Sequence, residues 1–142
     1  MYPEIELIVL VEEDPYEAEL FQMTSRDMGL SSFVRVFRTG GEAVESIMSI
    51  RPDSFPVSLF VLNIDLPDFK GTSVCDMIRQ HPFLSDSSIV FLTHVPSRKS
   101  HEIKAEYPGV EVFKKPISLD EYEGVITNIL EYAKRSREHQ VA

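Results

Sequence analysis

The strict alternation of short apolar segments with segments of helical periodicity constrains the fold of this chain most. Val, Ile, Leu and Phe dominate the short segments, which is typical of strands covered on both faces of a sheet. Each is followed by a stretch with apolar residues at three- and four-residue spacing, as on one face of a helix. The alternation predicts right-handed crossovers and a parallel sheet with helices on both faces, an α/β fold. The predicted strands cover residues 5–11, 33–37, 57–62, 88–93 and 110–113.

Capping signals indicate where the helices between these strands begin. Asp14 stands directly before a proline, so its carboxylate can cap a helix that has proline in its first turn. Thr39 with Glu42, and Ser118 with Glu121, have the spacing of a capping box. The predicted helices cover residues 14–29, 39–48, a stretch of two or three turns ending at 80, a short polar segment at 99–106, and 118–134.

Composition and charge restrict the class of protein. A chain of 142 residues, of which 43% are hydrophobic, fits one globular domain over 1–142. The net charge of −9 argues against a nucleic-acid partner, which would need a clustered basic face. The one basic cluster is Lys134, Arg135 and Arg137, which we interpret as favourable charge at a helix end.

The cysteine content and the length of the apolar runs indicate the compartment. Cys75 lies among apolar residues, so we expect it to be buried, and a single cysteine excludes an internal disulfide. The apolar run near the N-terminus is too short to cross a bilayer and lacks the features of a leader peptide. We therefore expect a cytoplasmic protein without a membrane partner.

Polar residues follow four of the five predicted strands, at the point where each strand ends. The carboxyl ends of parallel strands meet at one edge of the sheet, where α/β proteins gather their functional groups. We therefore expect these side chains to form one site. They are Glu12, Glu13 and Asp14 after the first strand, Asn63 and Asp65 after the third, Thr93 and His94 after the fourth, and Lys114, Lys115 and Pro116 after the fifth.

In this order and spacing, these residues resemble the receiver domain of two-component response regulators. The resemblance covers residues 4–134 and leaves 135–142 as a C-terminal tail. It implies a flavodoxin-like (βα)5 three-layer sandwich with strand order 2-1-3-4-5, which agrees with the pattern of elements. The loop at 62–71, with its Pro and Gly, resembles the segment that carries the phosphoacceptor of the family.

The resemblance also implies a role for each pocket residue. In the family, an acidic pair helps to hold Mg²⁺, an Asp accepts a phosphoryl group, and a Thr or Ser and a Lys-Pro pair complete the pocket. In this chain, Glu12 and Glu13 resemble the acidic pair, and Thr93 resembles the hydroxyl residue. Lys115 and Pro116 resemble the Lys-Pro pair. Pro116 is a candidate for a cis peptide bond.

Asn63 stands at the acceptor position of this resemblance. A carboxylate oxygen can attack phosphorus, whereas an amide oxygen is neutral, weakly nucleophilic and mainly a hydrogen-bond acceptor. We therefore expect ordinary aspartyl phosphorylation to be absent. Asn63 makes the chain resemble an atypical member of the family, a pseudo-receiver.

Further departures from the family pattern point the same way. Glu12 and Glu13 replace shorter acids, which moves each carboxylate outward by about one C–C bond, ~1.5 Å, so Mg²⁺ binding should be weak at most. His94 follows the hydroxyl residue where the family keeps a small side chain, so it is expected to crowd the pocket. Val112 replaces the aromatic residue that moves with the hydroxyl in many receivers. Thr93 then lacks its switch partner.

Two alternatives stay open. The first is a working regulator phosphorylated at an unconventional residue, Asp65 or Asp68. Side-chain alternation would place Asp65 on the same side as Asn63, but the following Pro and Gly indicate that the chain is already turning there. The second is a metal-dependent enzyme that uses Glu12, Glu13 and Lys115 on a phosphorylated metabolite. We prefer to interpret Lys115 as a charge partner of Glu12 or Glu13.

The function expected from the sequence is therefore a signalling interaction module and not an enzyme. No cofactor is required. The resemblance implies a histidine kinase or a downstream regulator as partner, and a second copy of the chain as a further candidate. The expected contact face is formed by the fourth helix, the fifth strand and the fifth helix, which correspond to residues 99–106, 110–113 and 118–134.

Overall fold

The computed structural model describes residues 7–30, 33–54, 56–94 and 97–141, with the side chains of 97 and of 137–141 outside the description. Residues 5 and 6 of the first predicted strand, and the side chain of Arg137, therefore lie outside the described part. Among the described residues, no helix combines the length and apolar character that crossing a bilayer requires.

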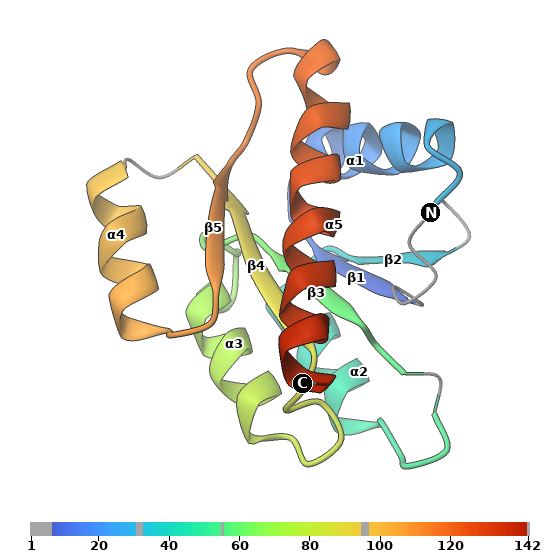
Figure 1. Ribbon diagram of the computed structural model, residues 1–142, viewed down its shortest axis with the longest axis vertical. Coiled ribbons are helices and arrows are strands. Elements are labelled where there is room, and N and C mark those ends of the chain that lie inside the picture. Colours follow the sequence, from blue (N-terminus) through green and yellow to red (C-terminus); the bar gives the residue numbers. More distant parts are fainter. Residues whose placement is uncertain (1–6, 31–32, 55, 95–96, 142) are drawn as a thin grey trace.

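A five-stranded parallel sheet forms the centre of the molecule, with the order β2-β1-β3-β4-β5 (Figure 1). This confirms the predicted fold class and strand order. The register matters for the site, because Val11 pairs with Leu62 and Leu62 pairs with Phe91. The residues that follow these strands consequently emerge side by side at one edge. The strands are β1 Ile8–Val11, β2 Val34–Phe37, β3 Leu59–Leu62, β4 Ser88–Thr93 and β5 Glu111–Lys114.

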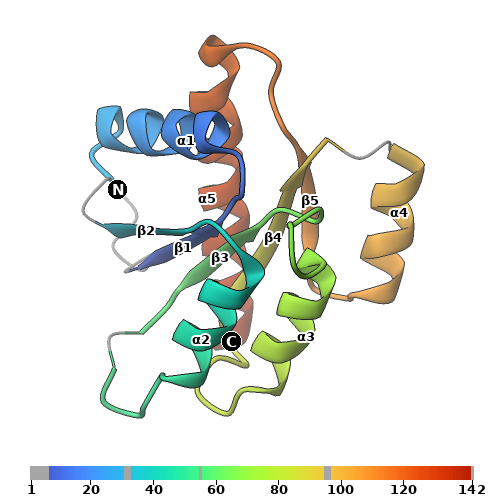
Figure 2. The same ribbon diagram turned by 180° about the vertical axis from the view of Figure 1, so that it is seen from behind.

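Helices cover both faces of the sheet, which makes three layers (Figures 1 and 2). One face packs against α1 and α5, for example through Phe21 and Ile126. The other packs against α2, α3 and α4, through Ile47, Ile78 and Ile103. The helices are α1 Pro15–Asp27, α2 Gly40–Met48, α3 Gly71–Gln80, α4 Ser97–Glu106 and α5 Leu119–Val141. Cys75 is completely buried on α3, as predicted.

The capping signals have different outcomes in the structure. The Asp14 carboxylate accepts the N–H of Tyr16 at 2.8 Å, and the Thr39 hydroxyl accepts the N–H of Glu42 at 3.0 Å, so both cap helices as predicted. The reciprocal bond of the Thr39 box is shifted by one residue, because Glu42 accepts the N–H of Arg38. In the other predicted box, the Ser118 hydroxyl donates to the carboxylate of Glu121 at 3.0 Å.

Two sequence-based expectations about the end of the chain differ from the structure. Helix α5 continues to Val141, beyond the apolar stripe that ends at Ala133, because the polar residues that follow are mostly good helix formers.

The peptide bond before Pro116 is trans. No peptide bond among the described residues is cis, so the prediction of a cis bond there was wrong. The Lys115 N–H donates to the Thr93 carbonyl at 2.8 Å, so the ladder of the sheet continues up to the proline. The trans form is also the more stable one for an X–Pro bond.

Gly71 is the most constrained glycine of the fold. A Cβ at this position would lie 2.0 Å from the carbonyl oxygen of Asn63 and 3.0 Å from the Cα of Ile64, both of them backbone atoms. The chain can therefore fold back against its acceptor strand only with glycine here.

We expect Gly71→Ala to lower the free energy of unfolding by about 2–4 kcal/mol, because backbone must move to admit the methyl group. Gly124→Ala is the matched control, since a Cβ there meets nothing within 4 Å. Relieving the entropy cost of glycine inside helix α5 should leave stability unchanged or raise it by up to ~1 kcal/mol. Urea unfolding of both variants measures the difference, and equal effects would contradict the close approach at Gly71.

Candidate functional site

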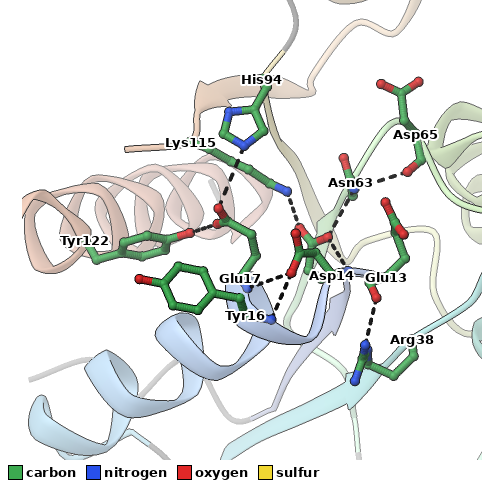
Figure 3. A network of polar contacts seen from close by, with 11 residues as sticks. Glu13, Asp14, Tyr16, Glu17, Arg38, Asn63, Asp65, His94, Lys115 and Tyr122 are labelled. Carbon is green, nitrogen blue, oxygen red and sulfur yellow. Dashed lines mark hydrogen bonds and ion pairs between the residues drawn. The ribbon is translucent and has the colours of Figure 1, made fainter. Parts of the chain in front are cut away.

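The candidate site lies at the carboxyl edge of the sheet, where β1, β3, β4 and β5 end (Figure 3). Backbone bonds continue the sheet one residue past the strands. Asn63 N–H donates to the Val11 carbonyl, and Glu12 N–H donates to the Phe37 carbonyl, each at 3.0 Å. Glu12 and Asn63 are thereby held next to each other, although 51 residues separate them in the chain.

The Glu12 carboxylate is the centre of the site and is almost completely buried, with 3% of the residue exposed. One oxygen, Oε1, lies 2.5 Å from Nζ of Lys115. The other, Oε2, accepts from Nδ2 of Asn63 at 3.2 Å and from the N–H of Asp14 at 3.1 Å. Figure 3 shows the side chains of Lys115 and Asn63 entering the centre of the site from different strands. A buried charge is tolerated when it is paired and hydrogen-bonded, and three donors meet that requirement here.

Asn63 uses both hydrogens of its side-chain amide. Nδ2 donates to Glu12 and also to the backbone carbonyl of Asp65, each at 3.2 Å. An aspartate in the same place would have no hydrogen to donate and would set a second carboxylate against Glu12, which raises the cost of ionisation for both. The amide therefore replaces a repulsive contact with two hydrogen bonds.

The other acidic residues near the edge do not join Glu12 in the buried centre. Glu13 and Asp65 are exposed, and both take part in the site through their carbonyl oxygens. The Asp65 carbonyl accepts from Asn63, whereas the Glu13 carbonyl accepts from Nη2 of Arg38 at 2.7 Å. In Figure 3 the Asp65 carboxylate is turned away from Asn63.

A divalent cation fits this donor set poorly. Mg²⁺ needs several oxygen ligands in near-octahedral arrangement. The buried carboxylate already receives an ammonium group, an amide and a backbone N–H. Among the described residues, no group of three His, Cys, Asp or Glu side chains is placed to hold a metal ion.

Asp68, one of the alternative acceptors, lies outside the pocket. Its carboxylate oxygens accept the N–H groups of Gly40 at 2.8 Å and Gly41 at 2.7 Å, at the start of α2. Although desolvation acts to raise it, these backbone hydrogen bonds hold the pKa of the Asp68 carboxyl below its usual value. Asp68 is thus engaged as a helix cap.

Thr93 and Val112, the switch-like residues, occupy separate environments. Thr93 is 2% exposed at the end of β4, and its carbonyl accepts the N–H of Lys115. Val112 is half-buried on β5 and packs against the apolar core of the α2–α3–α4 face. That Thr93 has no aromatic switch partner at position 112 stays a prediction.

His94 leans toward α1, where its Nε2 lies 3.8 Å from Oε1 of Glu17 (Figure 3). The side chain of His94 is 66% exposed. That it crowds the pocket stays a prediction. The other Glu17 oxygen accepts the hydroxyl of Tyr122 on α5. Burial, together with the neighbouring Glu17 carboxylate, raises the pKa of the Tyr122 hydroxyl.

Sequence reasoning missed three residues of this arrangement: Arg38, Glu17 and Tyr122. Arg38 follows β2 directly, so the rule of polar residues at strand ends could have found it. Tyr122 lies among the buried apolar residues of α5, so its place in the sequence indicates only core packing. Its contact with Glu17, 105 residues away, has no signal in the sequence.

Comparison with known proteins decides the family. Residues 8–127 match the family described as "Response regulator receiver domain". This chain belongs to that family. It is a receiver domain of two-component signalling. The resemblance to the receiver-domain family is therefore confirmed.

Two curated relatives and one solved structure illustrate the range of similar proteins. The chain is 28% identical over 118 residues to "Sensory transduction protein BceR" of Halalkalibacterium halodurans, covering 80% of this chain and 45% of that protein. It is 26% identical over 93 residues to a "Probable cyclic di-GMP phosphodiesterase" of Vibrio cholerae serotype O1, covering 64% of this chain and 20% of that protein. The chain thus spans less than half the length of both relatives.

The solved structure shows the fold. The phosphorylated cyanobacterial phytochrome response regulator RcpA matches with a TM-score of 0.77 at 20% identity, over 89% of this chain and 92% of that chain.

The buried ion pair of Glu12 with Lys115 makes a double-mutant cycle informative. We expect Glu12→Gln and Lys115→Met each to lower the free energy of unfolding by about 3–5 kcal/mol, because each leaves an unpaired buried charge. The double variant removes both charges and should lose clearly less than the sum of the two.

The exposed pair Arg98–Glu102 supplies the control for this cycle. Its atoms lie 3.9 Å apart, and the side chains are 92% and 60% exposed. Glu102→Gln should change stability by no more than ~0.5 kcal/mol. Urea unfolding at neutral pH measures all four variants. Additive losses at Glu12 and Lys115 would show that the two charges do not depend on each other.

Proposed function

We propose that this receiver domain is a pseudo-receiver, a signalling interaction module that is not phosphorylated at Asn63. The observation that carries the proposal is the double donation by the Asn63 amide, to Glu12 and to the Asp65 carbonyl. The side chain at the acceptor position acts as a hydrogen-bond donor inside the pocket. A phosphoryl acceptor must instead present a nucleophilic oxygen.

The electrostatics of the pocket support the same function. Glu12 and Lys115 neutralise each other within the buried centre, and Asn63 adds no charge. In such a pocket the Glu12 carboxylate needs no cation to neutralise it. Any Mg²⁺ binding is therefore weak, and no cofactor is required. In phosphorylated receivers the modification shifts an equilibrium between conformations. Without it, the output depends on partner binding, on another ligand at the pocket, or on concentration alone.

The proposed partners are signalling proteins, either a histidine kinase or a downstream regulator, and a second copy of the chain is a further candidate. The proposed contact face is formed by α4, β5 and α5. A shallow groove of about 360 Å³ lies on it between β5 and α5, with Val112, Phe113 and Tyr132 among its lining residues. We propose a cytoplasmic location and no enzymatic activity, as is general for receiver domains.

Incubation with acetyl phosphate and Mg²⁺, followed by intact-mass measurement, tests the proposal directly. We expect no stable gain of one phosphoryl group, because the amide cannot act as acceptor and Asp68 is held at the start of α2. A receiver domain with an aspartate acceptor serves as positive control. A gain of one phosphoryl group at useful occupancy would overturn the proposal. Asp65→Asn and Asp68→Asn would then identify the acceptor.

Restoring the carboxylate with Asn63→Asp separates the amide from the rest of the pocket. We expect weak or no labelling, because the Glu12 carboxylate is already paired with the ammonium group of Lys115. Without metal, the variant should be about 1–3 kcal/mol less stable than the parent, since it loses two hydrogen bonds and gains a repulsion. Mg²⁺ should stabilise the variant more than the parent in thermal unfolding. Full labelling of the variant would show that the amide alone blocks the chemistry.

A further inference from the structure

The loop at 63–71 is closed at its base and cannot move independently of the acceptor position. The Gly71 N–H donates to the Ile64 carbonyl at 2.7 Å, and Asp65 and Lys70 form an antiparallel bridge. The backbone of Gly71 also packs directly against that of Asn63. Any displacement of this loop therefore acts on the residue whose side chain enters the pocket.

The tip of the same loop is fastened to helix α2. The two Asp68 oxygens take the first two N–H groups of the helix, at Gly40 and Gly41, where a negative charge is favoured. A Cβ at Gly40 would lie 2.8 Å from the Cβ of Phe69, and one at Gly41 would lie 2.9 Å from Oδ2 of Asp68. A side chain at position 40 would force Phe69 to shift, and one at position 41 would displace the carboxylate of Asp68.

A second link joins the pocket to α2 from the side of β1. Nη2 of Arg38 donates to the Glu13 carbonyl at 2.7 Å, and the N–H of Arg38 donates to Oε2 of Glu42 at 3.0 Å (Figure 3 shows Arg38 beside Glu13). Glu42 lies in the first turn of α2. The loop after β1 and the loop after β3 are therefore both attached to the start of one helix.

The opposite side of the pocket is joined to the end of β5 through the ion pair of Lys115 with Glu12. Val112 on β5 is a short, half-buried apolar side chain that packs against the core, so it has less reach than a large aromatic side chain. The contacts of the loops after β1 and β3 with the start of α2 form a separate route out of the pocket.

We propose that Asp68 is a positioning residue through which the pocket and helix α2 change together. On one side, α2 borders a groove of about 520 Å³ against β2, lined by Val36, Phe37, Glu42, Glu45, Ser46 and Ser49. This inference goes beyond the proposed function and holds whether or not the chain can be phosphorylated.

The side-chain amide of Asn63 supplies a direct reporter of the pocket in two-dimensional ¹H–¹⁵N NMR spectra. Its NH₂ signals are assigned by their disappearance in Asn63→Asp. In Asp68→Ala we expect these signals to shift, and the amides of Gly40 and Gly41 to exchange with solvent about tenfold faster, because two charge-assisted hydrogen bonds are lost. The milder Asp68→Asn keeps one acceptor and should give a smaller change in the same direction.

Asp53→Ala controls for the loss of one negative charge, since Asp53 is an exposed carboxylate between α2 and β3. It should leave the Asn63 signals and the exchange of Gly40 and Gly41 unchanged. A faster exchange at Gly40 and Gly41 with unmoved Asn63 signals in Asp68→Ala would show that Asp68 is only a local helix cap, and would overturn the proposal.

The reverse experiment starts from the pocket. Asn63→Ala should raise the exchange rates of Gly40 and Gly41 more than those of the β5 residues Val112 and Phe113. An equal or larger response in β5 would overturn the inference. Neither outcome bears on the phosphodonor experiment, so failure of the inference and failure of the proposed function can be told apart.

Discussion

The buried carboxylate of Glu12 is the interaction on which the rest of the site depends. It receives an ammonium group from the end of β5, an amide from the end of β3 and a backbone N–H from the start of α1. Three elements that are distant in sequence are thereby held at one point. Because a buried charge is stable only while its partners remain, each of these elements restrains the others.

This arrangement also explains why an asparagine is compatible with a receiver fold. An amide is a weaker nucleophile than a carboxylate, but it can donate hydrogen bonds as well as accept them. In the pocket it donates to Glu12, which an aspartate could not do without first taking up a proton. The scaffold of the family is retained, with the same strand order and layers.

The loop after β3 shows how backbone geometry connects this pocket to a distant surface. Gly71 permits the chain to fold back on Asn63, and the pair Gly40–Gly41 permits the loop tip to reach α2. Each contact needs the absence of a side chain on one partner. Asp68 then fills the space with a carboxylate directed at the helix start, where unsatisfied N–H groups prefer an anion. Packing and electrostatics thus act on the same few residues.

The sequence by itself determined the layered α/β fold, because the period of its apolar residues distinguishes strands from helices and strict alternation leaves a parallel sheet as the consistent solution. It also determined that polar residues gather at one edge. Only the tertiary structure decided that Glu12 is buried while Glu13 is exposed, how the Asn63 amide is oriented, and that Asp68 caps α2. The physical reason is that side-chain alternation ceases to hold where a strand ends. Beyond that point, the direction of each side chain depends on contacts with residues far away in the chain, such as Asn63 with Glu12 and Asp68 with Gly41.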